Sequence, residues 1–261
     1  MEVRVDNKIF LVTGAAQGLG RAIAIEAARS GAAGIVLTDR PSKRVDAVAA
    51  EISKLGAKAA FVPGDLVEHD APGKIVASAV EQFGRLDGLV NAAGLSDRGS
   101  VATVDPAFFD LLFAVNTRAP MFLMQAVIRH LQERKAPGSI VNVLSFQAHG
   151  ASVNLAIYGA TKAALSLLTK NAAFAHRKDR IRIFGINLGW ADTDGEREMQ
   201  AVKLGRGEAW LEEAEARMSW GRLIKPQDVA HLALFLLSDI SIPMNGALID
   251  QVQDAVLGVR D

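Results

Sequence analysis

Short apolar runs alternate along the chain with longer stretches in which apolar residues recur every three or four positions. The runs are rich in Val, Ile, Leu and Phe, which favour β-strands, whereas the longer stretches are rich in Ala, which favours helices. Seven strands are predicted, near residues 9–13, 34–38, 59–62, 88–91, 139–143, 181–186 and 247–250. Six helices are predicted between them, near 19–30, 42–55, 71–83, 108–133, 155–176 and 226–237.

This alternation of strand and helix predicts an α/β fold in which repeated βα units form a parallel sheet. Because no repeat or linker interrupts the units, we expect a single domain over residues 1–261. The domain is predicted to be doubly wound, with a seven-stranded parallel sheet and helices on both faces.

Residues 194–218 depart from the pattern, since they are largely charged with only scattered apolar positions. The segment follows the carboxyl end of the sixth predicted strand, the edge at which α/β sheets bind ligands. We therefore predict a substrate lid at about 190–220. A solvated pair of helices is the alternative.

The composition and net charge of the chain indicate which kinds of molecule it binds. Of the 261 residues, 50% are hydrophobic, enough for a large core, and 29 Lys and Arg residues match 29 Asp and Glu residues. A net charge of zero gives no reason to expect nucleic acid or an anionic membrane, so we expect a small-molecule substrate. The absence of Cys excludes disulfides and thiolate chemistry, and the five scattered His residues predict no metal site. The N-terminal apolar run, 9–12, is too short for a signal segment, and a cytoplasmic location is expected.

A glycine-rich turn at residues 13–20 lies between the first strand and the first helix, and it contains Gly14, Gly18 and Gly20. Glycines there allow a tight turn and let the backbone approach a pyrophosphate, which the unpaired N–H groups of the helix N-terminus stabilise. This context predicts a Rossmann-type dinucleotide-binding site, with a purely structural loop as the alternative.

Asp39 ends the second apolar run, nineteen residues after Gly20. A carboxylate at that place accepts hydrogen bonds from the adenosine ribose hydroxyls and repels a 2′-phosphate, which predicts NAD(H) over NADP(H). Arg40 could accept that phosphate, but Gln17 supplies no second cation from the turn. NADP is therefore the less favoured cofactor.

Tyr158 is the only tyrosine in the chain, and Lys162 follows it four positions later. Residues at that spacing share one face of a helix, where an ammonium favours ionisation of a phenol, so Lys162 is predicted to lower the pKa of Tyr158 from its ordinary ~10. Ser145 lies thirteen residues before the tyrosine. With the glycine-rich turn, these residues describe a nicotinamide-dependent carbonyl/alcohol oxidoreductase.

In these motifs the chain resembles the classical type of the short-chain dehydrogenase/reductase superfamily, over nearly its whole length. The matching residues are the turn at 13–20, Asp65, the Asn-Ala-Ala-Gly stretch at 91–94, Asn116, Ser145, Tyr158, Lys162, Asn187 and Thr193. Three places depart from the family pattern, namely Ala92, Leu188 and the pair Asp250-Gln251.

The resemblance implies a role for each matching residue. Tyr158 would be the general base in alcohol oxidation and the general acid in carbonyl reduction, and Lys162 would lower its pKa and hold the nicotinamide ribose. Ser145 would hydrogen-bond the reacting oxygen, and Asn116 would hold a water that relays protons. Residues predicted to bind the cofactor are Gly14, Gln17, Gly18, Leu19, Gly20, Asp39, Arg40, Asp65, Leu66, Asn91, Ala92, Ala93, Gly94, Tyr158, Lys162, Gly189 and Thr193.

Residues predicted to contact the substrate are Gln147, His149 and Trp190, which would make a partly polar pocket. Together with the NAD preference, they favour a secondary alcohol or ketone of the sugar or polyol type. The alternative within this reaction class is reduction of a 3-oxoacyl thioester with NADPH, and the alternative from another class is a non-catalytic NAD(H)-binding sensor or scaffold. The resemblance also implies a homotetramer or homodimer, assembled through the helices at 108–133 and 155–176.

Overall fold

The computed structural model describes residues 2–255 and 257, and within them seven strands form one parallel sheet in the order β3-β2-β1-β4-β5-β6-β7. The strand bounds are β1 Ile9–Thr13, β2 Gly34–Thr38, β3 Lys58–Phe61, β4 Gly88–Asn91, β5 Gly138–Val143, β6 Ile181–Leu188 and β7 Leu248–Gln251. Each lies within two residues of its predicted bounds. β1, β2 and β4 are buried along their whole length, as their apolar runs require.

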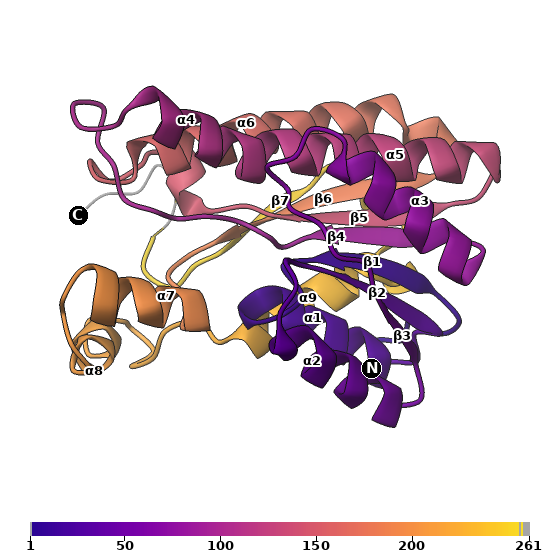
Figure 1. The fold of residues 1–261 in the computed structure, drawn as a ribbon, viewed down its shortest axis with the longest axis horizontal. Helices are drawn as coiled ribbons and strands as arrows, with labels where there is room; N and C mark the ends of the chain where they lie inside the picture. Colours follow the sequence, from indigo (N-terminus) through magenta and orange to yellow (C-terminus); the bar gives the residue numbers. More distant parts are fainter. Residues whose placement is uncertain (1, 256, 258–261) are drawn as a thin grey trace.

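Helices cover both faces of the sheet (Figure 1). One face carries α1 Gly18–Arg29, α2 Lys43–Lys54 and α9 Pro226–Leu237, and the other carries α3 Ala71–Phe83, α4 Pro106–Phe113, α5 Ala119–Glu133 and α6 Ala156–Ala175. Two large apolar clusters correspond to these two layers, one on each side of the strands. Short 3₁₀ turns complete the fold, at η2 Phe146–Ala148, η3 Arg177–Asp179 and η5 Asp239–Ser241. The predicted fold class, a doubly wound seven-stranded α/β domain, is confirmed.

The strand order changes direction between β1 and β4, which are neighbours although two βα units separate them along the chain. Ligands of doubly wound sheets bind beyond the carboxyl ends of the strands at such a switch point. Here Thr13, the last residue of β1, pairs in register with Asn91, the last residue of β4. The Oγ1 of Thr13 accepts hydrogen bonds from the backbone N–H groups of Ala92 and Ala93, each at 3.2 Å. These bonds hold the two loops that leave the strands side by side.

The predicted helix at 108–133 is interrupted by a π-helical turn, η1 Ala114–Arg118, which separates α4 from α5. Pro120 has no N–H to donate to the carbonyl of Asn116, four positions earlier, and the loss of that bond accounts for the irregular turn.

Within the described residues, one stretch, Pro106–Glu133, is long and apolar enough to cross a membrane, but 61% of its most apolar window is buried. Its α5 part packs against β4 and β5 of the sheet.

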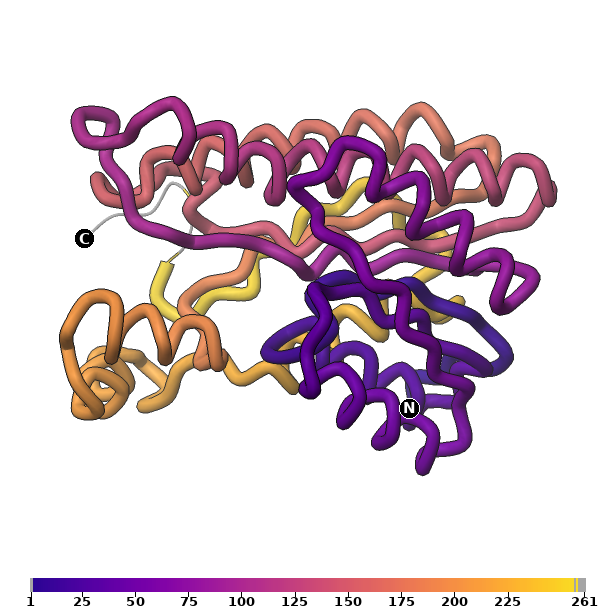
Figure 2. Tube along the Cα trace, viewed as in Figure 1, coloured from indigo at the N-terminus to yellow at the C-terminus, as the bar shows by residue number. Residues whose placement is uncertain are grey.

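Residues 194–218, which we call the charged segment, lie apart from the sheet, beyond the carboxyl ends of the strands (Figure 2). It contains α7 Asp194–Glu198, a π turn η4 Met199–Lys203 and α8 Trp210–Glu215. A small apolar cluster of Trp210, Ala214 and Leu223 holds it together, and Trp190 packs against this cluster. The segment is therefore not a fully solvated helical pair, since part of its surface is buried within it.

Candidate functional site

Two adjoining cavities lie at the carboxyl edge of the sheet. The first, which we call the glycine-rich cavity, measures about 600 Å³ and is lined by the turn after β1 and by the ends of β2, β3 and β4. The second, which we call the tyrosine cavity, measures about 650 Å³ and is lined by the end of β5, the start of α6 and the charged segment. The residues common to both linings are Leu19, Ala92, Gly94, Leu95 and Thr193. Both volumes are in the range of small-molecule sites.

The turn after β1 brings the backbone close to its neighbours. Gly14 has a φ of +65°, and a Cβ on it would lie 2.8 Å from the Cα of Ala93. Gly18 also has a positive φ, +55°, so both positions require the freedom of glycine. The Gly18 N–H donates to the Asp194 carboxylate at 3.3 Å, which shows that this amide faces an anion. The helix N-terminus of α1 thus opens onto the glycine-rich cavity with the polarity that a phosphate requires.

The end of β2 places charged side chains at the far side of this cavity. Asp39 accepts hydrogen bonds from the N–H of Ala16 at 3.0 Å and of Arg40 at 2.8 Å. Arg44, from α2, donates to the side-chain oxygen of Gln17. Gln17 itself supplies no cation from the turn, but α2 brings the guanidinium of Arg44 to its side chain. The spacing of the two residues, 27 positions, carries no local signal.

Most of the predicted cofactor residues line one of the two cavities, including Asp65 and Leu66 in the first and Gly189 in the second. Asn91 does not. It is buried at the end of β4, where its Nδ2 donates to the side chain of Asn142 at 2.8 Å. Its side chain therefore stabilises the strand ends beneath the cavity, and the approach of the 91–94 backbone to a cofactor stays a prediction.

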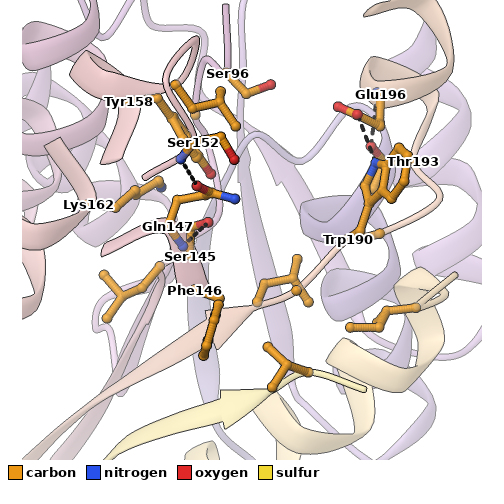
Figure 3. A pocket seen from close by; sticks show the side chains of 18 of the residues that line it. Ser96, Ser145, Phe146, Gln147, Ser152, Tyr158, Lys162, Trp190, Thr193 and Glu196 are labelled. Atoms are coloured by element: carbon orange, nitrogen blue, oxygen red, sulfur yellow. Dashed lines mark hydrogen bonds between the residues drawn. The ribbon is translucent and has the colours of Figure 1, made fainter. Parts of the chain in front are cut away.

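Ser145, Tyr158 and Lys162 meet at the tyrosine cavity (Figure 3). Ser145 follows β5, and the other two residues lie one turn apart on α6, as their spacing predicted. Lys162 is only 4% exposed, and its Nζ donates to the carbonyl of Val143 at 2.8 Å. The same Nζ lies 5.9 Å from the centroid of the Tyr158 ring.

The pKa values of these groups differ from the sequence-based expectation. Burial raises the pKa of Tyr158 above its ordinary 10.0, and a hydrogen bond with Ser145 opposes that rise. Burial also lowers the pKa of Lys162 from 10.5 to about 8. The predicted lowering of the Tyr158 pKa by Lys162 is not found, since the ammonium bonds to a backbone carbonyl and burial of the phenol dominates.

Asn116 is completely buried in the π turn and joins three segments of the chain. Its side chain accepts from the N–H of Leu95 and donates to the Leu95 carbonyl, each at 2.8 Å, and it also donates to Thr161 at 3.1 Å. A Cβ on Gly94 would lie 3.3 Å from the Asn116 Oδ1 and 3.4 Å from the Lys162 Nζ. Asn116 thus fixes the loop after β4 beside the lysine.

The opposite wall of the tyrosine cavity comes from the loop after β6 and the first half of the charged segment. In Figure 3, Trp190, Thr193 and Glu196 face Tyr158 and Lys162 across the cavity. The Thr193 side chain accepts from the N–H of Glu196 at 3.1 Å and caps α7. Glu196 forms an ion pair with Arg98 at 3.1 Å. Arg98 could not be predicted from the sequence, because an arginine in an irregular loop has no pattern that marks it.

Two of the three predicted substrate residues, Gln147 and Trp190, line the tyrosine cavity. His149 does not line it. Its Nε2 lies 3.1 Å from the Asp250 carboxylate and 3.1 Å from the Asn187 amide, so the ring is directed toward β6 and β7. His149 thus lies outside the cavity lining that Gln147 and Trp190 share. In the described part of the chain, no group of three or more His, Asp or Glu residues could hold a metal ion.

Comparison with known proteins agrees with this geometry. Residues 14–250 match a family model described as Enoyl-(Acyl carrier protein) reductase. The chain is 34% identical to a short-chain dehydrogenase/reductase, FrzI, of Cladobotryum sp, over 94% of each chain. It is 32% identical to an L-rhamnose 1-dehydrogenase (NAD(P)(+)) of Sphingomonas sp., over 93% of this chain and 94% of that one.

Among solved structures, the fold matches a 3-oxoacyl (acyl-carrier-protein) reductase of Agrobacterium tumefaciens with NADP bound, at a TM-score of 0.86 and 26% identity. The match covers 95% of this chain and 94% of that one. The family model, the relatives and this structural match all extend over nearly the whole domain. The chain therefore belongs to the short-chain dehydrogenase/reductase superfamily of nicotinamide-dependent oxidoreductases, as the resemblance of its motifs predicted.

Proposed function

We propose that this protein transfers a hydride between NAD(H) and a secondary alcohol or ketone, and that its substrate is a sugar, a polyol or a related hydroxylated metabolite. The observation that carries the proposal is the meeting of Ser145, Tyr158 and Lys162 at one cavity, which adjoins the glycine-rich cavity. A polar triad beside a dinucleotide site is what this reaction class requires.

The residues of the glycine-rich cavity fit a dinucleotide. The close approach of Gly14 to Ala93 and the amide of Gly18 at the start of α1 suit a pyrophosphate, and Asp39 suits the adenosine ribose. Thr193 and Gly189 would hold the nicotinamide end, because they line the tyrosine cavity. When bound, the nicotinamide supplies or accepts the hydride.

The chain's own residues would move the proton. In reduction, the Tyr158 hydroxyl would donate its proton to the carbonyl oxygen. In oxidation, the phenolate would accept the proton of the substrate hydroxyl. Ser145 would hydrogen-bond the same oxygen and stabilise the charge that develops on it. Lys162 and Asn116 would complete the proton path, because both reach the loop at Gly94.

The lining of the tyrosine cavity supports a hydroxylated substrate. Polar groups that line it include Ser96, Gln147, Ser152, Asn154 and Gln200. One relative is an L-rhamnose 1-dehydrogenase, which is consistent with a sugar. Reduction of a 3-oxoacyl thioester with NADPH is the second candidate, because Arg40 and Arg44 could receive a 2′-phosphate and a structural neighbour of that activity has NADP bound.

A substrate panel tests this choice. Sorbitol, xylitol, L-rhamnose and acetoacetyl-CoA are assayed with NAD⁺ or NADH and with NADP⁺ or NADPH. We expect turnover of a polyol or sugar with NAD⁺. Turnover of the thioester with NADPH alone would replace the first proposal by the second, and NADH binding without any turnover would favour a sensor or scaffold.

The cofactor preference is expected to depend on Asp39. In the Asp39→Ser variant, the carboxylate that repels a 2′-phosphate is lost while Arg40 and Arg44 remain. The ratio of kcat/KM for NAD⁺ to that for NADP⁺ should fall by about tenfold or more, which corresponds to roughly 1.4 kcal/mol. Asp46→Ser, at an exposed position of α2, is the matched control. An unchanged ratio in Asp39→Ser would contradict the ribose assignment.

We also propose that the charged segment acts as a lid. Its ends are held together at the base, where the buried carboxylate of Asp192 pairs with Arg197 at 2.6 Å and with Lys225 at 2.9 Å. Its outer part is tied across the cleft by the ion pair of Lys203 with Asp97 at 2.8 Å. A segment with a fixed base and exposed ionic contacts at its rim can open by breaking those contacts.

Self-association through α6 is part of the proposal. Ala160 and Ala163 are exposed, so these alanines do not pack on the sheet of their own domain. Leu167 and Phe174 on the same helix are 70% and 68% exposed. A helix face on which both small and large apolar residues are exposed suits contact with a second copy of the chain. We therefore propose a homodimer or a homotetramer, and we propose that the protein is cytoplasmic.

A further inference from the structure

An almost buried carboxylate with one unused oxygen lies in the wall of the tyrosine cavity. The side chain of Glu196 is 12% exposed and that of its partner Arg98 is 17% exposed. Three donors converge on the Oε1 of Glu196, namely Arg98 at 3.1 Å, the Trp190 indole at 2.9 Å and the Gln200 amide at 2.6 Å. The three donors lie in different segments, namely the loop after β4, the loop after β6 and the π turn after α7. Together they hold the carboxylate in one orientation.

The second oxygen, Oε2, accepts no hydrogen bond from the described residues, and it is not sealed from solvent. Because Glu196 lines the cavity, this oxygen is available to a molecule bound there. Figure 3 shows Glu196 on the wall that faces Tyr158. A carboxylate oxygen accepts hydrogen bonds and cannot donate them, so its natural partner is a hydroxyl or amine of the ligand.

On the basis of the proposed function, we infer that Glu196 selects substrates that carry a second hydroxyl beyond the reacting carbon, by accepting a hydrogen bond from that hydroxyl on Oε2. Arg98, Trp190 and Gln200 are positioning residues for this contact. The pair of Glu196 with Arg98 is neutral as a unit, so it favours an uncharged polyhydroxylated substrate over one with a carboxylate. An ether or thioester oxygen at the same place would face the carboxylate without a proton to share and would be disfavoured.

A purely structural role predicts a different result. If the pair only fastened the lid to the loop after β4, its loss would impair all substrates alike. The two charges also act on the pKa of Tyr158 in opposite directions, but such an effect is the same for every alcohol. A ratio of rates between substrates that differ in one hydroxyl therefore isolates the proposed contact.

The test uses Glu196→Gln with three sets of probes. Butane-2,3-diol is compared with butan-2-ol, hexane-2,5-diol with hexan-2-ol, and butane-2,3-diol with 3-methoxybutan-2-ol, each under saturating NAD⁺. In the wild-type protein we expect kcat/KM for at least one diol to exceed that for its mono-ol by about tenfold or more, mainly through KM. The same diol is expected to exceed an ether analogue by a similar factor.

In Glu196→Gln, the amide oxygen keeps the three donors and the NH₂ group faces the cavity. The preference for the diol over the mono-ol should shrink to within about threefold, because a neutral bond from the amide to the hydroxyl oxygen replaces the stronger charge-assisted bond from the hydroxyl to the carboxylate. The disadvantage of the methoxy compound should shrink as well, because the amide can donate to an ether oxygen. Glu198→Gln, exposed on the same helix and absent from the cavity lining, should leave all ratios unchanged.

An unchanged diol preference in Glu196→Gln would overturn the inference, as would a wild-type protein that turns over diol and mono-ol equally. If Glu196→Gln does not fold, equal wild-type turnover of diol and mono-ol still overturns the inference. Gln200→Ala, which removes one of the donors that hold the carboxylate, should then lower the diol preference, and an unchanged preference would contradict the inference. No turnover of any secondary alcohol with either dinucleotide would instead refute the proposed function, and the inference would fall with it.

Discussion

Replacing Tyr158 with Phe is expected to lower kcat about a thousandfold while binding of NADH is kept, because general acid–base groups contribute roughly 10²–10⁴-fold to rate. The variant loses only the hydroxyl, and the ring continues to line the tyrosine cavity. The measurements are the steady-state rate with the best substrate of the panel and the NADH affinity from its fluorescence.

Binding of NADH by Tyr158→Phe shows that the glycine-rich cavity is intact, so a loss of rate is then a loss of chemistry. Turnover at the wild-type rate would show that the proton comes from another group and would refute the catalytic assignment. An inactive wild-type protein that binds NADH would support the sensor or scaffold alternative.

Replacing Lys162 with Met is expected to raise stability at neutral pH while lowering kcat by about a hundredfold or more. The fall in the Lys162 pKa from 10.5 to about 8 means that burying the ammonium costs about 3 kcal/mol at neutral pH. Met keeps the apolar stem, and the lost hydrogen bond to Val143 costs about 1–2 kcal/mol. The net gain in the free energy of unfolding is therefore expected to be about 1–2 kcal/mol.

The gain in the free energy of unfolding of Lys162→Met should decrease as the pH rises. Below pH 8 Lys162 is protonated in both the folded and the unfolded chain, so the burial cost is fully present. As the pH rises from about 8 to 10.5, the folded protein releases the proton before the unfolded chain does, and the cost is relieved. The advantage of the Met variant over the wild type should therefore be largest below pH 8 and shrink above it.

Denaturant unfolding at several pH values measures this difference. Lys54→Met, at an exposed position in the last turn of α2, is the control and should show no such gain. Because Tyr158 is the only tyrosine, its phenol can also be titrated by near-ultraviolet absorbance in the wild type and in Lys162→Met. We expect similar, raised pKa values in both, and a large rise in the variant would restore Lys162 as the group that lowers the phenol pKa.

The elements and motifs that depend on neighbours in the chain could be predicted from the sequence. The apolar runs of β1 to β7 are local signals, and so is the i, i+4 spacing that puts Tyr158 and Lys162 on one face of α6. The turn with Gly14 and Gly18 was predicted because a tight turn between strand and helix demands glycine at these positions. The family resemblance rests on the same local patterns, and it was confirmed.

Contacts between distant segments could not be predicted in this way. Arg98 and Glu196 are 98 positions apart and meet only because the loop after β4 and the charged segment close on one cavity. His149 lies between Ser145 and Tyr158 in the chain, yet its ring turns toward Asp250, 101 positions away. Packing in three dimensions selects such partners, and no periodicity along the chain records them.

The direction of the pKa shifts of Tyr158 and Lys162 could not be predicted from the sequence either, because it also depends on residues that are distant in the chain. Spacing along α6 indicates that the ammonium of Lys162 acts mainly on the phenol, but in the structure the ammonium is buried and donates to the carbonyl of Val143. Tyr158 is half-buried in the cavity wall, and the loss of water around its phenol raises the pKa. Desolvation depends on every atom around a group, whereas helical spacing depends on two positions alone. The chain thus encodes the elements and the reaction class in local patterns, and the environment of each reactive group arises only when those elements pack together.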